Sequence, residues 1–110
     1  MSPQQGRVAE LNDQLRTTFF GGKVILTVGI ASLEDRLRIE VVRSVQSFSR
    51  FDDDNDPDGE HDFGAFEIGG VGKVFWKIDY YNRTLDGGSE NPADTSKTVR
   101  VLTIMLASEY

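Results

Sequence analysis

The sequence predicts an α+β fold: a small, mostly antiparallel sheet with two helices on one face, in the order α-β-α-β-β-β. Three observations support it. Apolar residues recur at helical spacing in two segments, short runs rich in β-branched or aromatic residues follow, and a glycine-rich turn joins two of those runs. Helices set apart from strands in this way pack on one face of a sheet. With 38% hydrophobic and 27% charged residues, the chain is predicted to be a single domain, residues 1–110.

The first helix is predicted to start at Ser2 and Pro3, a capping residue followed by a residue that favours the first helical turn. Apolar residues then recur at intervals of three and four, at Val8, Leu11, Leu15 and Phe19. The glycines at 21–22 end this pattern. The run 23–28 is short and rich in β-branched residues, so it is predicted to be a strand.

A second helix is predicted from residue 33 to about residue 48. Its apolar positions are Leu33, Leu37, Val41, Val45 and Phe48. A shorter alternation at Leu37, Ile39 and Val41 would suit a strand, but the five helical positions outweigh it. Residues 32–35 also resemble a capping box, which favours the helix.

A β-hairpin is predicted where two strand-like runs, 63–68 and 73–81, bracket the glycine-rich turn 69–72. Alternate side chains of the second run share a face, and one of its faces is apolar enough to belong to the core. The other face is half polar, so it is either solvated or the floor of a site. That face carries Phe75, Lys77, Asp79 and Tyr81.

The last third of the chain combines a long irregular segment with one more strand. Residues 82–97 are rich in glycine, asparagine and proline, and a loop of this length is often functional. Residues 98–106 are strongly β-branched and are predicted to form a central strand, with a C-terminal helix as the alternative.

The segment that departs furthest from ordinary composition is 51–62, which reads FDDDNDPDGEHD and which we call the acidic loop. It holds seven of the 18 acidic residues, no Lys or Arg, and the only histidine, His61. The formal net charge is -6, so the remaining residues, with 12 basic and 11 acidic side chains, are nearly neutral. Because the chain has no basic footprint, we expect no direct binding to nucleic acid. A local negative patch suits a cation or a protein partner with a basic surface.

The cellular location is predicted from what the sequence does not contain. No apolar run approaches a membrane span, there is no cysteine for a disulfide framework, and the first residues lack the pattern of a secretory signal. We therefore expect a cytoplasmic protein with no membrane partner. A homodimer is compatible with these features.

Metal binding is one hypothesis for the acidic loop. Residues 54–59 spell D-x-D-x-D-G, the first half of an EF-hand calcium loop, but the position of the bidentate glutamate is Ala65. A transition metal or magnesium is another alternative, with Asp56, Glu60, His61 and Asp62 as its ligands. Turn chemistry alone explains the same residue types, so we assign no cofactor and treat a divalent metal as the alternative. A purely structural loop with an internal His61 is the simplest interpretation.

Catalysis is a second hypothesis. His61 could act as an acid or base, with Lys77 and Asp79 as further catalytic candidates. The chain has no cysteine, no serine in a glycine-flanked elbow and neither the phosphate-loop nor the dinucleotide fingerprint. If the protein is an enzyme, metal-assisted hydrolysis is therefore the reaction that needs the fewest additional assumptions. Lys77 and Asp79 could equally form a surface ion pair, or close over the acidic loop and offset its charge.

Several motifs resemble a known family. They are residues 55–64 (NDPDGEHDFG), 75–81 (FWKIDYY), 100–107 (RVLTIMLA) and 11–16 (LNDQLR). The chain is similar to domain-of-unknown-function family 3768, small proteins of proteobacteria that are often found on plasmids and other mobile elements. The resemblance covers nearly the whole chain. It implies a bacterial cytoplasm and an accessory role on a mobile element, but it implies no activity, so no catalytic role is transferred.

The favoured function is that of a small, acidic, non-enzymatic interaction protein of a bacterial mobile element. It would bind, and could inhibit, a basic host protein such as a nucleic-acid-binding defence effector. The residues expected to contact the partner are Asp52, Asp53, Asp54, Asp56, Asp58 and Glu60. A metal-dependent hydrolase or nuclease centred on the acidic loop is the alternative function, and a calcium-stabilised structural loop is a further one.

Overall fold

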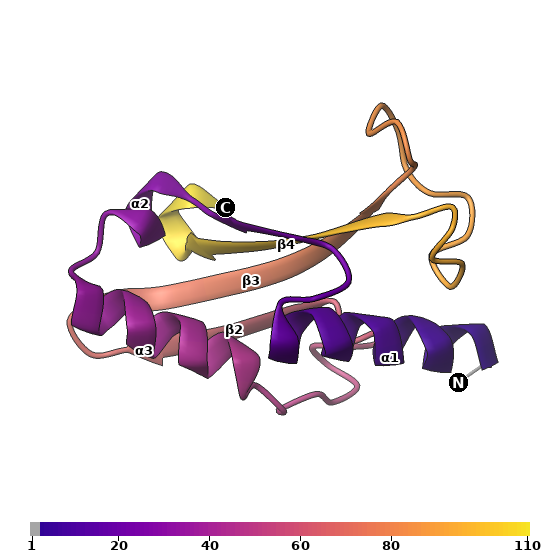
Figure 1. Cartoon of the computed structure of the whole chain (residues 1–110). Coiled ribbons are helices and arrows are strands. Elements are labelled where there is room, and N and C mark those ends of the chain that lie inside the picture. The colour runs from indigo at the N-terminus through magenta and orange to yellow at the C-terminus, as the bar shows by residue number, and fades with distance from the viewer. Residues whose placement is uncertain (1–2) are drawn as a thin grey trace.

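The chain is a mixed α/β protein with one four-stranded sheet, as the computed structural model of residues 3–110 shows (Figure 1). Its helices are α1 (Pro3–Thr18), α2 (Val28–Ala31) and α3 (Asp35–Gln46), with a 3-10 turn, η1 (Ala107–Glu109), after the last strand. Its strands are β1 (Lys23–Leu26), β2 (Phe63–Ile68), β3 (Gly72–Tyr81) and β4 (Val99–Leu106). Within residues 3–110, no helix is long and apolar enough to cross a membrane.

The sheet order is β1-β4-β3-β2, so β4 lies inside the sheet between β1 and β3. β3 pairs antiparallel with both β2 and β4, whereas β1 pairs parallel with β4. The prediction of a mostly antiparallel sheet is therefore wrong, and the sheet is mixed. A parallel pair needs a long crossover connection, and here the chain between β1 and β4 contains α2, α3 and the β2–β3 hairpin.

Both predicted long helices are present, but the predicted order of elements is wrong. α3 begins after Glu34, which makes no side-chain capping hydrogen bond, so the predicted capping box at residues 32–35 does not form. Ser32 instead ends the additional short helix α2. The observed order is therefore α-β-α-α-β-β-β, followed by η1. The predicted cap of α1, Ser2, lies outside the described residues.

The start of the short helix α2 contacts a residue that is far away in the sequence. The predicted strand 23–28 stops at Leu26, and Thr27 becomes the residue before the helix. The carboxylate of Glu109 accepts hydrogen bonds from the Thr27 hydroxyl at 2.6 Å and from the Gly29 backbone N–H at 2.9 Å. Because Glu109 lies about 80 positions away, local sequence patterns could not predict this helix.

The predicted hairpin and the predicted last strand are confirmed. β2 and β3 pair along the whole of β2, and the turn between them places Gly70 and Gly72 at φ values of 86° and 103°, where glycine is favoured. β4 confirms the strand predicted at 98–106 rather than the helical alternative. Residues 82–98 contain turns and bends, with one isolated bridge from Tyr81 to Gly88.

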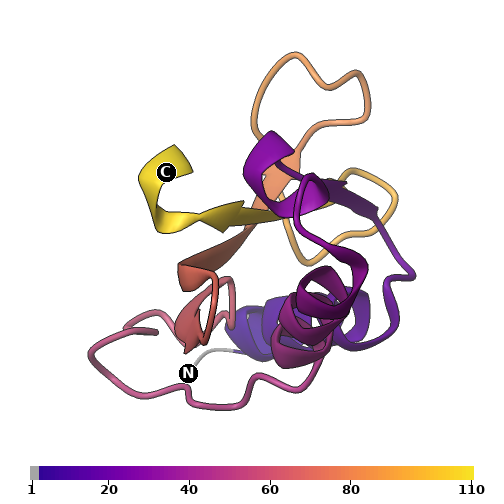
Figure 2. The ribbon, with the colours of Figure 1, turned by 90° about the vertical axis from the view of Figure 1, so that its left-hand side faces the viewer.

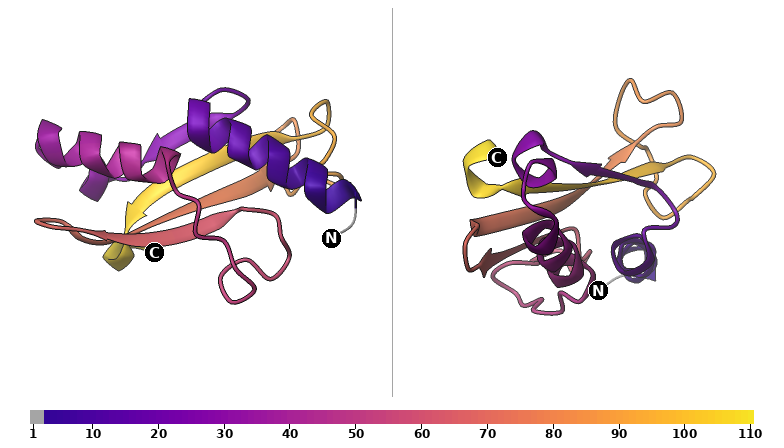
Figure 3. Two further views of the ribbon diagram at one scale, coloured as in Figure 1. Left: turned by 90° about the horizontal axis from the view of Figure 1, so that it is seen from below. Right: turned by 60° about the vertical axis from the view of Figure 1, so that its left-hand side comes forward.

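The core lies between one face of the sheet and the two long helices, α1 and α3 (Figures 1 and 3). Val74, Trp76 and Ile78 of β3 point to this face and are at most 4% exposed, as the period of two predicts. The residues that pack with them from the helices and the other strands include Leu15, Val41, Val45, Phe66, Leu102 and Ile104.

Two irregular segments lie on opposite sides of the molecule (Figure 2). The acidic loop connects α3 to β2 below the helices, and residues 82–98 connect β3 to β4 at the other side. The sheet face opposite α1 and α3 is not covered by a long helix (Figure 1). These surfaces are where functional contacts can form.

Candidate functional site

Asp56 holds the acidic loop together from the inside. Its side chain is buried, and its Oδ1 atom accepts the backbone N–H groups of Glu60 and His61 at 3.1 Å each. These hydrogen bonds close a tight turn that contains Gly59 at φ 69° and His61 at φ 55°. A buried carboxylate that satisfies backbone donors is a structural group. The predicted partner contact by Asp56 would therefore require this turn to open.

His61 connects the acidic loop to α1. Its Nδ1 atom is 3.0 Å from both carboxylate oxygens of Asp13, and its Nε2 atom is 3.6 Å from the Asp56 carboxylate. The imidazole also stacks on the Phe51 ring, with centroids 4.0 Å apart and planes 5° from parallel. Both ring nitrogens thus face carboxylates of the protein itself, which fixes the orientation of the ring.

Arg16 extends this cluster to α3. Its Nη2 atom pairs with Asp13 at 3.0 Å, and its Nη1 atom donates to the carbonyl groups of Val45 and Gln46 at 3.0 and 3.2 Å. The guanidinium carbon also lies 5.3 Å from the Trp76 ring centroid, in cation–π range. A single buried arginine therefore ties together α1, the end of α3 and the sheet.

Glu60 belongs to a second, partly buried network. Its carboxylate accepts the Tyr80 hydroxyl at 2.9 Å, and its carbonyl accepts Asn12 Nδ2 at 2.9 Å. Asn12 also donates to the Tyr80 hydroxyl at 2.8 Å and accepts Arg100 Nε at 2.9 Å. Burial, mainly, raises the pKa of Tyr80 far above its ordinary value, so the phenol stays protonated and donates. The predicted partner contact by Glu60 competes with this internal bond.

The outward side of the acidic loop is formed by the remaining carboxylates. Asp52 is exposed, and its Oδ1 atom accepts the backbone N–H groups of residues 54 and 55 at 2.9 and 3.0 Å. Asp53, Asp54 and Asp58 are exposed, and their side chains form no ion pair or hydrogen bond with any residue from 3 to 110. The carboxylates of the loop are thus divided between an inward set, which is bonded to the rest of the protein, and an outward set, in which only Asp52 accepts hydrogen bonds from residues 3–110.

Asp62 lies between these sets, at the end of the loop. Burial, the larger cause, and the negative charge of Glu60 raise the pKa of the Asp62 carboxyl, and Asp56 and Asp58 add to the effect. The folded protein therefore holds a proton on Asp62 up to a higher pH than the unfolded chain does.

The proposed metal ligands point in different directions. Asp56 faces the backbone of its own turn, Glu60 faces Tyr80, and His61 faces Asp13. In the part of the chain that the structure describes, no group of three His, Asp or Glu side chains is placed to hold a metal ion. The half EF-hand at 54–59 likewise splits, because two of its carboxylates are exposed and the middle one is buried.

The structure does not bring together the three proposed catalytic residues. His61 contacts α1, whereas Lys77 and Asp79 lie on the uncovered face of the sheet. Lys77 pairs with Asp79 at 3.0 Å instead of closing over the acidic loop. The hydrogen bond from this ammonium to Asp79 is the main reason that the pKa of Lys77 is raised. Of the two alternatives predicted for Lys77 and Asp79, the structure therefore shows the surface ion pair.

The uncovered sheet face is hollowed into a groove of about 810 Å³. Of the large apolar side chains that are exposed, four line it: Ile25, Tyr81, Leu85 and Tyr110. Three of the four residues of the half-polar strand face line it, namely Lys77, Asp79 and Tyr81, together with Val101, Thr103 and Met105 of β4. This surface can accept an apolar body, with the Lys77–Asp79 pair in its floor.

Sequence patterns missed most of the buried polar residues. Asn12 and Arg16 are at most 3% exposed, although neither was predicted to be buried. Their burial could have been predicted from the helical period, because positions 12 and 16 fall on the same side of the helix as the apolar positions 8, 15 and 19. Arg100 had a similar signal, since it alternates with the uncovered-face residues of β4 and must point toward α1.

A comparison with protein families identifies a match for most of the chain. A family model described as "Protein of unknown function (DUF3768)" matches residues 26–109. Three of the four motifs that suggested a resemblance fall in this range, and residues 11–16 lie before it. Neither the curated proteins nor the solved structures contain a significant match.

Proposed function

We propose, from the premise that this chain belongs to the DUF3768 family of unknown function, that it is a small non-enzymatic interaction protein. The partner is a protein with a basic surface, and the outward side of the acidic loop makes the contact. One observation carries the proposal. The loop residues that metal binding or catalysis would need are bonded to the protein itself, whereas Asp53, Asp54 and Asp58 are exposed and have no partner among residues 3–110.

The anchored loop suits recognition because its shape is set before binding. The Asp56 turn and the His61–Asp13 contact hold the loop against α1, so little conformational entropy is lost when a partner binds. Clustered carboxylates also attract a basic surface over roughly one Debye length, about 8 Å at physiological ionic strength. The expected association is therefore fast and sensitive to salt.

A nucleic-acid-binding protein has the required chemistry, because its binding surface presents rows of Lys and Arg to phosphates. A chain that occupies such a surface with carboxylates would inhibit the partner. In this proposal the chain acts in a bacterial cytoplasm as an accessory protein of a mobile element, and the partner is a host defence effector. The resemblance to small proteins of mobile elements supports this setting.

The test is a capture experiment with a matched control. Immobilised wild-type chain is exposed to bacterial lysate at low and high salt, and the bound proteins are identified by mass spectrometry. The variant D53N/D54N/D58N removes three charges and keeps residues that suit turns. The control E34Q/E40Q/E67Q removes three charges from exposed positions outside the loop. We expect a basic protein that the wild type and the control capture and that the loop variant loses.

Equal capture by the loop variant would overturn the proposal. A thermal-shift scan with calcium, magnesium, manganese and zinc separates the metal alternatives. A metal at 100 times its dissociation constant would stabilise the chain by about 2.7 kcal/mol, and we expect no such stabilisation. A shift of several degrees with one of these ions would instead favour the metal-dependent function.

A further inference from the structure

Three arginines from distant parts of the chain line one small pocket. Arg7 comes from α1, Arg83 from the segment after β3, and Arg100 from β4. The pocket has a volume of about 360 Å³. The other lining residues are Leu11, Gln14, Gly21, Gly22, Thr95, Thr98 and Val99. None of the lining residues is acidic, although the chain as a whole carries a formal charge of -6.

Arg100 forms the inner part of this pocket. The residue is 2% exposed, its Nε atom donates to Asn12, and its Nη2 atom donates to the carbonyl of Pro92. Its Nη1 atom makes no hydrogen bond to residues 3–110, and no carboxylate oxygen in that range lies within 4.0 Å of the guanidinium. A buried cation without a direct counter-ion is costly, so an anion supplied from outside would stabilise it.

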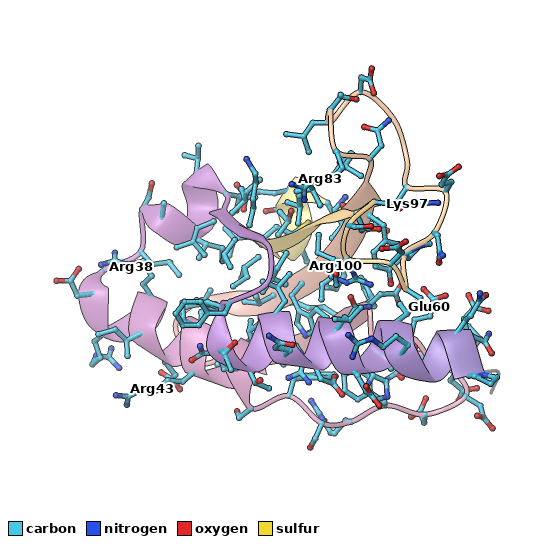
Figure 4. All side chains as sticks on the ribbon, turned by 45° about the vertical axis from the view of Figure 1, so that its right-hand side comes forward. Arg38, Arg43, Glu60, Arg83, Lys97 and Arg100 are labelled. Atoms are coloured by element: carbon cyan, nitrogen blue, oxygen red, sulfur yellow. The ribbon has the colours of Figure 1, made fainter. Side chains whose placement is uncertain are left out.

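Arg7 and Arg83 add positive charge at the rim. Arg7 pairs with Glu10 at 3.3 Å, but both side chains are more than half exposed, so this pair is weak. Arg83 is exposed and has no ion pair within residues 3–110. Figure 4 shows Arg100 between Arg83 and α1, with Glu60 nearby. Burial is the main reason that the pKa of Arg100 is lowered, and the positive charge of Arg7 lowers it further, whereas Tyr80 and Glu60 act in the opposite direction.

The remaining walls suit a small ligand. Gly22 packs directly against β4, since a Cβ atom there would lie 2.5 Å from the Arg100 carbonyl oxygen. This wall is therefore bare backbone, and Leu11 and Val99 supply apolar surface beside the charged groups. Gln14 and Thr95 add uncharged polar groups to the lining. The pocket can thus hold a charged group and a small organic group together.

We propose that this pocket binds the phosphate group of a small phosphorylated molecule, with Arg100 Nη1 inside and Arg7 and Arg83 at the rim. Guanidinium groups pair with phosphate oxygens through charge-assisted, often bidentate, hydrogen bonds. Three guanidinium groups without a lining carboxylate match a dianion better than they match a single carboxylate. The site does not include the outward carboxylates of the acidic loop, although Asn12 links Arg100 to the backbone of Glu60.

The test uses the full chain and two probes, inorganic phosphate and phenyl phosphate, at constant ionic strength set with chloride. NMR titration follows the side-chain Nε–H signals of the arginines. We expect saturable binding of both probes, with the Arg100 signal shifting and the Arg43 signal unchanged. Tighter binding of phenyl phosphate identifies a phosphorylated molecule as the ligand class. Equal or weaker binding of phenyl phosphate would mean that the site recognises the phosphate group alone, which would overturn that part of the proposal.

Variants at the rim avoid disturbing the buried Arg100. R83Q is expected to weaken binding about tenfold, because it removes one charge-assisted contact. R43Q, on the exposed side of α3 and without an ion pair in the described residues, is the matched control and should bind as the wild type does. The D53N/D54N/D58N variant should also bind normally, so this site can fail while the function proposed for the acidic loop stands. No saturable shift, or equal affinity in R83Q and wild type, would overturn the site.

Discussion

Individual carboxylates of the acidic loop have different roles, and their surroundings decide which. Asp56 is buried and bonded to two backbone N–H groups, whereas Asp58, two residues later, is exposed. Composition alone identified the loop as unusual, because seven acids lie within twelve positions. It could not tell the inward acids from the outward ones. That division depends on Asn12 and Asp13, which lie about 48 positions earlier on α1.

The role of Asp56 leads to a stability prediction. In D56A, the N–H groups of Glu60 and His61 lose their acceptor, so we expect a loss of about 1–3 kcal/mol in the free energy of unfolding. Urea denaturation monitored by Trp76 fluorescence measures it. D58A removes an exposed carboxylate from the same loop and should change stability by less than about 0.5 kcal/mol. If the two variants were equally stable, Asp56 would not be the anchor of the loop.

The pKa of Asp62 predicts a pH dependence with a defined sign. Burial and neighbouring acids raise this pKa, so folding binds a proton here, and wild-type stability falls as pH rises from about 3.8 through the raised value. Because asparagine does not ionise, the D62N variant does not lose stability in this way as pH rises. The stability of D62N relative to the wild type should therefore increase with pH across that window, as urea titrations at several pH values would show.

Asp94 provides a contrast of opposite sign. Hydrogen bonds from Ser96 lower the pKa of the Asp94 carboxyl, so its contribution to stability is present above its ordinary pKa and is lost as pH falls. The stability of D94N relative to the wild type should therefore decrease as pH rises. The same trend for D62N and D94N would contradict the environment described for Asp62.

Among the elements, β2 shows how a strand can depend on the absence of a side chain. Gly64 faces the core opposite Trp76, and a Cβ atom there would overlap the indole nitrogen and come within 2.8 Å of Phe48. Both rings are buried, so neither can move aside at low cost. The hairpin was predictable from its turn and alternation, but this close approach was not, because it involves a residue of the α3 end.

Replacing Gly64 tests this packing. G64A is expected to destabilise the chain by about 1–3 kcal/mol through overpacking. G69A is the matched control in the same hairpin, since a Cβ atom at Gly69 would meet no atom within 4 Å. Differential scanning calorimetry of the two variants measures the difference. A G64A variant as stable as G69A would show that the Trp76 region can adjust.

The elements also show where sequence patterns reach their limit. The long helices, the hairpin and β4 follow from periodicity, which is a property of neighbouring residues. The parallel pairing of β1 with β4 and the short helix α2 depend on contacts across about 75 to 80 positions. The mixed sheet was therefore not predictable from patterns that describe one segment at a time.

At the scale of the whole molecule, one charged cluster is continuous in the sequence and another is assembled by the fold. The acidic loop lies on one side, and the segment that carries Arg83 lies on the other (Figure 2). The sequence revealed the negative part because its residues are consecutive. The arginine pocket was hidden, since its three guanidinium groups are up to 93 positions apart in the chain and only the fold brings them together.

The central place of β4 has a consequence for how the chain folds during synthesis. β1 leaves the ribosome early, yet β4, its neighbour in the sheet, is translated about 75 residues later. Until then β1 has no partner and one edge of β3 is unpaired, so the nascent chain exposes strands that could pair with other chains. Closing so distant a contact is slow. Completion of the sheet is therefore a late event, and the nascent chain would benefit from a chaperone that shields these strands.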